Sequence, residues 1–277
     1  MSSPRKVVLV TGSSDGGIGA SICQAFVERG CTVVATARKV SSMQTLDQPL
    51  VTKLELDVTS DQSVTNCINK VIDLHGKIDI LVNNAGAGGT GALLDFTPDD
   101  MRQTFETNVF GVARVTQAVV PHMVKRKSGL VINIGSIVGN IATPWAGVYA
   151  SSKAALHSWS EALRMEVKGF GINVMLVAPG SIKSNFGKKQ LESFNMPENS
   201  MYKHVTKYIA ARASAGQDIR SVPSSTIAQG IVSRALKRYP TTYYTAGGNS
   251  LIFWILERLP RWVSWLLLAR LLGTNKV

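Results

Sequence analysis

Residues 6–27 read KVVLVTGSSDGGIGASICQAFV, and this stretch decides the fold. It opens on a continuous apolar run typical of a buried strand, continues through four glycines and ends in the helical pattern of Ile22, Phe26 and Val27. Glycines let the backbone turn sharply and approach a ligand, and free N–H groups at the start of a helix face an anion. A glycine-rich turn alone is as often a plain loop, but the order strand, glycines, helix predicts a pyrophosphate site.

Apolar runs typical of strands recur along the rest of the chain and alternate with helical patterns. The candidate strands cover residues 7–10, 32–37, 51–56, 78–82, 130–134, 172–177 and, more weakly, 242–245. Continuous apolar runs are expected of strands that are covered on both faces. We therefore predict one α/β domain of the Rossmann type, with a doubly wound parallel sheet of about seven strands and helices on both faces.

Tyr149, Lys153 and Ser136 form a candidate catalytic group. Tyr149 precedes Lys153 by four residues in a segment predicted to be helical from about residue 147, so the two side chains share one face. Lowering a phenol pKa from about 10 to about 7 takes roughly 4 kcal/mol, and an ammonium about 4 Å away supplies roughly that much at an effective dielectric of about 20. Ser136, which follows a candidate strand, would direct a substrate oxygen to the phenol. A Tyr and a Lys one turn apart more often form an ordinary helix face, so the prediction of carbonyl reduction depends on the glycine-rich turn.

The nicotinamide cofactor is predicted from charge. A site for NAD usually presents an acidic side chain to the ribose about twenty residues after the glycine-rich turn. No Asp or Glu occurs from Cys31 to Leu46, and the second candidate strand ends in Ala37-Arg38-Lys39. Arg38 would hold a 2′-phosphate with its planar fork, whereas the alternative is a solvated basic turn. We predict NADPH/NADP+ as the cofactor, since hydride chemistry needs a nicotinamide and the protein supplies its placement.

Several motifs together resemble the short-chain dehydrogenase/reductase family, in the family's order and spacing over nearly the whole chain. They are Thr11-Gly12 with Gly17-Ile18-Gly19, Asn83-Asn84-Ala85-Gly86, Asn108, Ser136, Tyr149, Lys153 and Pro179-Gly180. The chain departs from the family's usual turn by one extra residue between Gly12 and Gly17. This variant and the hydrophobic C-terminal segment resemble the branch of NADPH-dependent 1-acyldihydroxyacetone-phosphate reductases, with hydroxysteroid and retinol dehydrogenases as relatives.

The resemblance implies roles for further residues. Asn108 would hold a water that links Lys153 to solvent, Lys153 would also contact the ribose, and Asp57 would lie near the adenine ring. The alternatives are that Asp57 caps the helix starting near Ser60, and that Asn84 belongs to a plain turn. The implied catalytic residues are Asn108, Ser136, Tyr149 and Lys153. The implied cofactor contacts are Gly12, Ser14, Gly17, Ile18, Gly19, Arg38, Asp57, Asn84, Ala85, Gly86, Tyr149, Lys153, Pro179, Gly180, Ile182 and Ser184.

Composition argues against several other classes of function. The chain of 277 residues suits one large core, and its three cysteines show neither a paired nor a metal-binding spacing, so free thiols are expected. The four histidines are scattered, and no metal site is predicted. The formal net charge of +12 comes from dispersed basic residues without a nucleic-acid motif. It therefore favours an anionic membrane surface or small anions as partners over nucleic acid.

The α/β rhythm breaks at about residues 186–224, and a long segment of this kind in a compact domain is often a lid. It mixes the apolar residues Phe194, Met196, Met201, Tyr202, Tyr208 and Ile209 with Lys188, Lys189, Lys203, Lys207 and Arg212. Apolar walls with cations suit an acyl chain that carries a phosphate. An amphipathic helix pair with a solvated basic face explains the pattern equally well. We expect this segment to cover the substrate.

The C-terminal segment 251–277 is apolar but interrupted. The residues that break the run are Glu257, Arg258, Pro260, Arg261 and Arg270, and they make it a poor membrane span. Two short helices hinged near Pro260 and lying in a lipid interface fit better, with a dimer contact or a flap over the substrate pocket as alternatives. We therefore divide the chain into a catalytic domain, residues 1–250, and a membrane-associating tail, residues 251–277.

The combined expectation is an NADPH-dependent reductase of a lipid ketone. Its leading substrate is 1-acyldihydroxyacetone phosphate, with steroids and retinoids next, and a homodimer is a further expectation. Its expected place is the cytosolic face of the endoplasmic reticulum or a lipid droplet. The alternative from another class is an NADP-binding scaffold that recruits partners to lipid without catalysis, against which the intact Ser136, Tyr149 and Lys153 argue.

Overall fold

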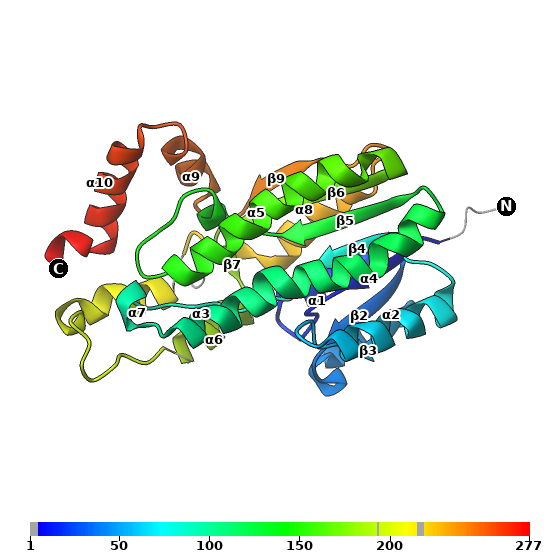
Figure 1. The fold of residues 1–277 in the computed structure, drawn as a ribbon, viewed down its shortest axis with the longest axis horizontal. Coiled ribbons are helices and arrows are strands. Elements are labelled where there is room, and N and C mark those ends of the chain that lie inside the picture. Colours follow the sequence, from blue (N-terminus) through cyan, green and yellow to red (C-terminus); the bar gives the residue numbers. More distant parts are fainter. Residues whose placement is uncertain (1–4, 193, 215–218) are drawn as a thin grey trace.

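The computed structural model describes residues 5–192, 194–214 and 219–277. Within these residues a parallel sheet of seven strands forms the centre, in the order β3-β2-β1-β4-β5-β6-β9 (Figure 1). The strands are β1 (Val7–Val10), β2 (Thr32–Ala37), β3 (Val51–Glu55), β4 (Ile80–Asn83), β5 (Gly129–Ile134), β6 (Ile172–Pro179) and β9 (Tyr243–Ala246). Every predicted strand is present with its ends shifted by two residues at most, and the predicted doubly wound fold is confirmed.

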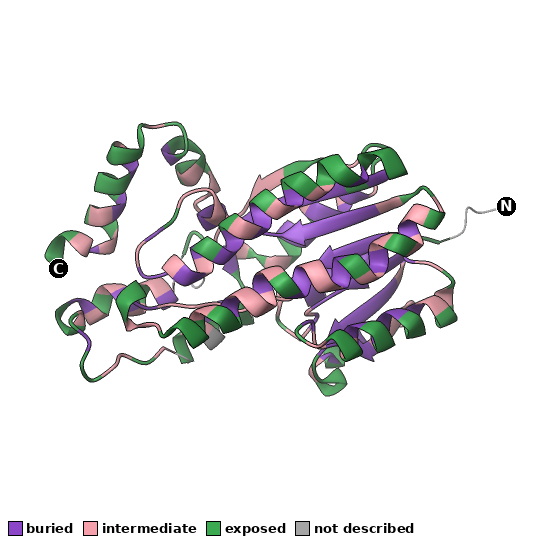
Figure 2. Cartoon of the chain, viewed as in Figure 1, coloured by how far each residue is buried: buried purple, intermediate pink, exposed green. Residues whose placement is uncertain are grey.

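Helices cover both faces of the sheet, as its continuous apolar strands require. Those on one face are α1 (Ile18–Glu28) and α8 (Ser224–Ala235), and those on the other are α2 (Asp61–His75), α4 (Gly111–Lys125) and α5 (Gly147–Val167). In β1, Val8 and Val10 belong to the core on the side of α1 and α8, and Leu9 belongs to the core on the side of α2, α4 and α5. Figure 2 shows the central strands as buried, the edge strand β9 as largely intermediate, and the outer faces of the helices as exposed. The covered sheet therefore supports a site at the carboxyl ends of its strands, where a ligand can approach.

The segment between β6 and α8 departs from the α/β alternation. It contains α6 (Asn185–Glu192) and α7 (Thr206–Ala213), and the short parallel pair of β7 (Ile182–Lys183) and β8 (Val222–Pro223) lies at its base. The sequence does not predict this pair, because two-residue strands carry no pattern that separates them from a loop. The role of this segment as a lid stays a prediction.

Two short helices end the chain, α9 (Ser250–Leu256) and α10 (Arg261–Leu272), with the turn between them ending at Pro260. The predicted pair of short helices that meet near Pro260 is thus confirmed. The Ser264 hydroxyl donates to the Leu256 carbonyl at 2.8 Å, and the Trp145 indole N–H donates to the Leu272 carbonyl at 2.7 Å. No helix in the described residues combines the length and the apolar character that a bilayer crossing requires.

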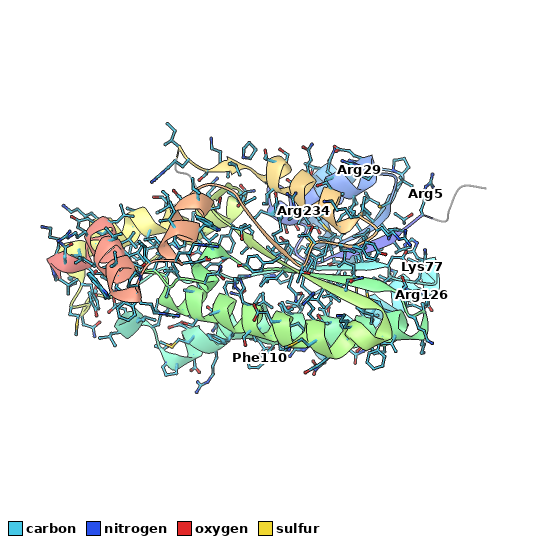
Figure 3. All side chains as sticks on the ribbon, turned by 90° about the horizontal axis from the view of Figure 1, so that it is seen from above. Arg5, Arg29, Lys77, Phe110, Arg126 and Arg234 are labelled. Carbon is cyan, nitrogen blue, oxygen red and sulfur yellow. The ribbon has the colours of Figure 1, made fainter. Side chains whose placement is uncertain are left out.

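Part of the positive charge lies at the edge of the sheet opposite its carboxyl ends. Figure 3 labels Arg5, Lys77 and Arg126 near the amino ends of β1, β4 and β5, away from the C-terminal helices. Lys77 and Arg126 lie 2.8 Å and 3.6 Å from the carboxylate of Asp79. Asp79 in turn accepts the N–H of Val7 at 2.8 Å. Lys77 and Arg126 therefore stabilise the strand starts, and neither lines the cavity described below.

Candidate active site

A cavity of about 900 Å³ lies at the carboxyl ends of the strands. It extends from the glycine-rich turn before α1, past the ends of β4 and β5, to α7 and the C-terminal helices. Open parallel sheets bind ligands at such a place, beside the point where the strand order reverses, here between β1 and β4. All predicted site residues line the cavity except Gly19 and Asn108, which lie directly behind its wall.

The glycine-rich turn leaves no room for side chains. Gly12 has a φ of +71°, and a Cβ there would lie 2.8 Å from the Ala85 Cα. A Cβ on Gly19 would lie 2.4 Å from the Gly12 carbonyl oxygen. The α1 helix begins at Ile18 without a capping side chain, so its first N–H groups remain available to an anion in the cavity. These features fit the pyrophosphate of a dinucleotide.

Asn84 holds this turn in shape. Its amide nitrogen donates to the carbonyls of Thr11 and Gly12, each at 2.9 Å. In return, the Thr11 hydroxyl accepts the N–H groups of Asn84 and Ala85, each at 3.0 Å. The segment after β4 is therefore more than a plain turn, because it fixes the backbone of the glycine-rich turn from behind.

The extra residue in the turn has a structural use. The Asp15 carboxylate accepts the backbone N–H groups of Gln44 and Thr45, at 2.8 Å and 3.1 Å. The hydroxyls of Ser14 and Ser42 lie 3.0 Å apart. Through Ser14 and Asp15, the longer glycine-rich turn therefore holds the loop that follows β2 in place.

Arg38 and Asp57 lie at the cofactor end of the cavity. Arg38 is exposed directly after β2. The Asp57 carboxylate accepts the N–H and the hydroxyl of Thr59, at 3.0 Å and 2.8 Å. These hydrogen bonds, followed by the charges of Arg38 and Arg114, hold the pKa of Asp57 below its usual value although burial raises it. The cap of α2 is Ser60, whose hydroxyl accepts the Ser63 N–H, so Asp57 does not cap that helix.

The three candidate catalytic side chains converge on the cavity as predicted. Tyr149 and Lys153 lie on α5, and Ser136 follows β5. The Lys153 ammonium donates to the Ile134 carbonyl at 2.8 Å and lies 5.7 Å from the centre of the Tyr149 ring. Burial lowers the pKa of Lys153 to about 8. The arrangement places a buried ammonium, a phenol and a hydroxyl around one point at the end of the sheet.

The expected phenol pKa near 7 is wrong for this arrangement. Burial raises the pKa of Tyr149, and it outweighs a hydrogen bond with Ser136 and the charge of Arg212, which act in the opposite direction. Lys153 contributes less than expected because its ammonium turns to the Ile134 carbonyl. The phenol is therefore protonated at neutral pH, as a group that donates a proton must be.

Asn108 lies in a π-helical turn, Glu106–Phe110, that continues α3 (Pro98–Phe105). Its oxygen accepts the Ala87 N–H at 2.8 Å, and its amide nitrogen donates to the Ala87 carbonyl at 2.8 Å and to the Ser152 hydroxyl at 2.9 Å. Both ends of the side chain thus bind protein groups, and Asn108 fixes the loop after β4 next to α5. The water link to Lys153 stays a prediction.

The segment after β6 supplies the last part of the predicted cofactor site. Pro179, Gly180, Ile182 and Ser184 all line the cavity. A Cβ on Gly180 would lie 2.0 Å from the Gly248 carbonyl oxygen, so this position accepts glycine alone. No group of His, Cys, Asp and Glu among the described residues is arranged to hold a metal ion.

Only part of the basic lid reaches the cavity. Arg212 and Arg220 line it, and the Tyr149 ring lies 5.8 Å from that of Phe186 at the start of α6. Lys188, Lys203 and Lys207 are exposed and lie outside the cavity lining. The Lys189 side chain lies outside what the structure describes. Lys188, Lys203 and Lys207 thus belong to a solvated basic face, whereas Arg212 lines the cavity.

His157 is a site residue that sequence reasoning missed. Its Nε2 accepts the Ser136 N–H at 3.3 Å, and its Nδ1 lies 2.8 Å from the Asn140 side-chain oxygen, so Nδ1 carries the proton. A Cβ on Gly135 would lie 2.2 Å from the His157 Nε2. The signal was present, because Tyr149, Lys153 and His157 recur at four-residue intervals on one face of α5. His157 therefore positions the backbone that carries Ser136.

We predict that protonation of His157 destabilises the fold. Burial, followed by the charge of Lys153, lowers its pKa from 6.5 to about 4, so the unfolded chain binds this proton more readily than the folded chain. The free energy of unfolding should fall as the pH falls from about 6.5 to about 4, by up to roughly 3 kcal/mol from this residue. Urea titrations of the wild type and of His157→Gln at both ends of this window measure it. An equal loss of stability in the two proteins would contradict the assignment.

Residues 6–194 match the family described as short chain dehydrogenase. The chain is 34% identical over 274 residues to the short-chain dehydrogenase ptmH of Penicillium ochrochloron, which spans 98% of this chain and 99% of that protein. It is also 34% identical over 209 residues to the NADPH-dependent 1-acyldihydroxyacetone phosphate reductase of Schizosaccharomyces pombe, across 74% of this chain and 70% of that protein.

A solved short-chain dehydrogenase from Streptomyces avermitilis superposes with a TM-score of 0.79 at 32% identity, over 91% of each chain. At 91% coverage, the match must include most of the chain beyond residue 194. The extent of the sequence match and the glycine-rich turn at the cavity support the same assignment. The chain belongs to the short-chain dehydrogenase family, and it is an NAD(P)-binding oxidoreductase.

Proposed function

We propose that the protein uses NADPH to reduce a lipid ketone to a secondary alcohol. The leading reaction is the conversion of 1-acyldihydroxyacetone phosphate to 1-acylglycerol 3-phosphate. The observation that carries the proposal is the apolar wall of the cavity beyond the catalytic residues, which consists of Ile252, Phe253, Leu256, Leu268, Leu271 and Leu272. Such a wall suits an acyl chain, and a relative from Schizosaccharomyces pombe is named for this reaction.

Charge favours NADPH over NADH. Arg38 lies exposed at the rim of the cavity beside the turn that contains Ser14. The nearby acids are engaged, since Asp15 accepts hydrogen bonds from Gln44 and Thr45 and Asp57 accepts them from Thr59. Among the described residues neither carboxylate forms an ion pair with Arg38, and its guanidinium suits a 2′-phosphate better than bare ribose hydroxyls.

The bound nicotinamide would supply the hydride, and the chain's residues handle the oxygen and the proton. The Ser136 hydroxyl would donate to the ketone oxygen and hold the carbonyl beside the phenol. Tyr149 would give its proton to that oxygen as the hydride adds to the carbon, so one NADPH and one proton are consumed for each ketone. Lys153 would contact the ribose, and its positive charge would stabilise the phenolate that the proton transfer leaves on Tyr149.

A substrate screen tests the proposed function. NADPH oxidation should be fastest with 1-palmitoyldihydroxyacetone phosphate in a panel that also contains retinal and ketosteroids, all in detergent. Reduction of a steroid or retinal without reduction of the ketolipid would replace the proposal with a hydroxysteroid or retinol dehydrogenase. Binding of NADPH without reduction of any ketone would favour the non-catalytic scaffold.

The outer faces of α9 and α10 support a lipid surface as the second part of the proposal. Exposed apolar side chains there include Leu251, Trp254, Ile255, Trp262, Trp265, Leu266 and Leu267. The Arg258 guanidinium lies 3.7 Å from the centre of the Trp254 ring, an arrangement suited to the depth of lipid headgroups. Because the inner faces of the same helices line the cavity, a lipid ketone would enter from the surface on which they rest. That surface would be the cytosolic face of the endoplasmic reticulum or a lipid droplet, and the division at residue 250 stays a prediction.

The double variant Trp262→Gln/Trp265→Gln should bind liposomes at least 10-fold less tightly. Each large apolar side chain removed from water contributes roughly 1.5 to 3 kcal/mol. Even partial insertion of the two tryptophans should therefore change the binding constant by more than tenfold. Flotation with vesicles that contain anionic lipid measures the effect. The matched control is Phe170→Gln, which removes an exposed aromatic side chain outside the C-terminal helices. Unchanged flotation of the double variant would place the lipid contact elsewhere or remove it.

A further inference from the structure

Arg212 is a basic residue of the predicted lid, and its side chain lies at the cavity rather than on the outer surface. It lies on α7 and lines the same cavity as Tyr149. Its Nε donates to the hydroxyl of Thr143, at 3.4 Å, and Thr143 is itself buried. Its helix is anchored by Ile209, which is fully buried in a cluster with Trp145. The guanidinium is therefore held by a packed helix and a buried hydroxyl, and it is not a freely moving surface charge.

The guanidinium has no counter-charge in the described residues. Within residues 5–192, 194–214 and 219–277, no carboxylate forms an ion pair with Arg212, and Thr143 is the hydrogen-bond partner of its side chain. Burial lowers the pKa of Arg212, and its interaction with Tyr149 opposes this change. A guanidinium stays protonated under these conditions, so its partial removal from water is costly unless an anion accompanies it. The terminal nitrogens of Arg212 remain available to form that pair.

We propose that Arg212 binds the anionic group of the substrate, a phosphate or a carboxylate carried within a few bonds of the ketone that Tyr149 protonates. The planar fork of a guanidinium pairs with such groups through two parallel hydrogen bonds. The apolar wall formed by α9 and α10 lies in the same cavity, so the ligand is an amphiphile whose anion meets α7 and whose chain follows the C-terminal helices. In 1-acyldihydroxyacetone phosphate the phosphate is on the carbon next to the ketone. A neutral ketosteroid or retinal has no anionic group for Arg212 to bind. The inference rests on the proposed function only for the identity of the lipid.

A matched pair of ketones tests the inference. The pair is 1-palmitoyldihydroxyacetone phosphate and 1-palmitoyldihydroxyacetone, which differ by the phosphate alone. Arg212→Gln should lower kcat/KM for the phosphorylated ketone roughly 10- to 150-fold, mostly through KM, because it removes hydrogen bonds to a charged group. For the neutral ketone kcat/KM should stay within about threefold of the wild type. Arg212→Lys should fall between the two proteins, since it keeps the charge and loses the fork.

The control is Lys203→Gln, which removes the same charge from an exposed position on the same lid. It should change neither ketone's kcat/KM by more than about twofold, because exposed charges contribute little. An equal loss for both ketones in Arg212→Gln, with a shifted pH profile of kcat, would mean that Arg212 acts on the Tyr149 phenol, and the inference would fall. An unchanged ratio between the two ketones would also overturn it.

Direct binding separates this inference from the proposed function. Calorimetry with the enzyme and NADP+ compares dodecyl phosphate, dodecanol and inorganic phosphate. The wild type should bind dodecyl phosphate more tightly than either of the others, and Arg212→Gln should lose that preference. If the wild type reduces neither ketone but shows the preference, the proposed function fails and the anion site stands. If it reduces both ketones and shows no preference in binding or in kcat/KM, the proposed function stands and the anion site fails.

Discussion

Tyr149→Phe should reduce ketones about 10²- to 10⁴-fold more slowly than the wild type, which is the usual contribution of a positioned general acid. The phenol lies in the cavity with Ser136, and its raised pKa keeps it protonated at neutral pH. Phenylalanine keeps the ring that lies against Phe186 and removes the one proton that the reaction uses. The binding of NADPH should stay nearly normal, because the glycine-rich turn and Lys153 are unchanged.

Steady-state rates and NADPH fluorescence titrations of the same preparation measure these two effects. Tyr208→Phe is the matched control, because Tyr208 lines the same cavity from α7 and the substitution likewise removes a phenol hydroxyl. It should stay within about threefold of the wild type, since no step assigns its hydroxyl a proton. A Tyr149→Phe enzyme as active as this control would remove the phenol from the mechanism.

Arg38→Asp should invert the choice of cofactor. It removes a charge-assisted fork on the 2′-phosphate, worth about 1.5 to 3 kcal/mol or roughly 10- to 150-fold, and places a repelling carboxylate there. The same carboxylate accepts hydrogen bonds from the ribose hydroxyls of NADH, so the efficiency with NADH should rise. The ratio of kcat/KM for NADPH to that for NADH measures both effects together.

Lys39→Asp controls for the change in overall charge. Lys39 is the next residue in the chain, is exposed, and lies outside the cavity lining. Its replacement should change the ratio only slightly, through screened charge at a distance. If Arg38→Asp leaves the ratio where Lys39→Asp leaves it, the 2′-phosphate is bound by another group.

The elements that sequence predicts well here are those with local causes. Val8, Leu9 and Val10 are apolar because both faces of β1 are covered, and that pattern is visible without any knowledge of the neighbouring strands. Likewise, Gly12 and Gly19 are required by backbone contacts within a short turn and its neighbour, so their spacing alone indicates the phosphate site. Pro260 indicates the hinge between α9 and α10 for the same reason.

The features that sequence does not predict depend on contacts between distant segments. The ammonium of Lys153 is directed by a carbonyl on β5, so its distance from the Tyr149 ring does not follow from their spacing on α5. Burial then decides the direction of the Tyr149 pKa, and burial is a property of the assembled cavity. Arg212 could not be distinguished from Lys203 by composition, because only the packing of α7 turns Arg212 into the cavity, whereas Lys203 lies before that helix and is exposed.

The central claim is that the cavity transfers hydride from NADPH to the ketone carbon of an acylated, phosphorylated substrate. The most direct measurement uses NADPH deuterated at the nicotinamide C4, in one preparation for each face, with 1-palmitoyldihydroxyacetone phosphate. Mass spectrometry should find 1-palmitoylglycerol 3-phosphate with one deuterium on its central carbon from one preparation and none from the other, and Tyr149→Phe should yield almost no product. A folded, NADPH-binding protein that forms no deuterated alcohol from either preparation would contradict the account.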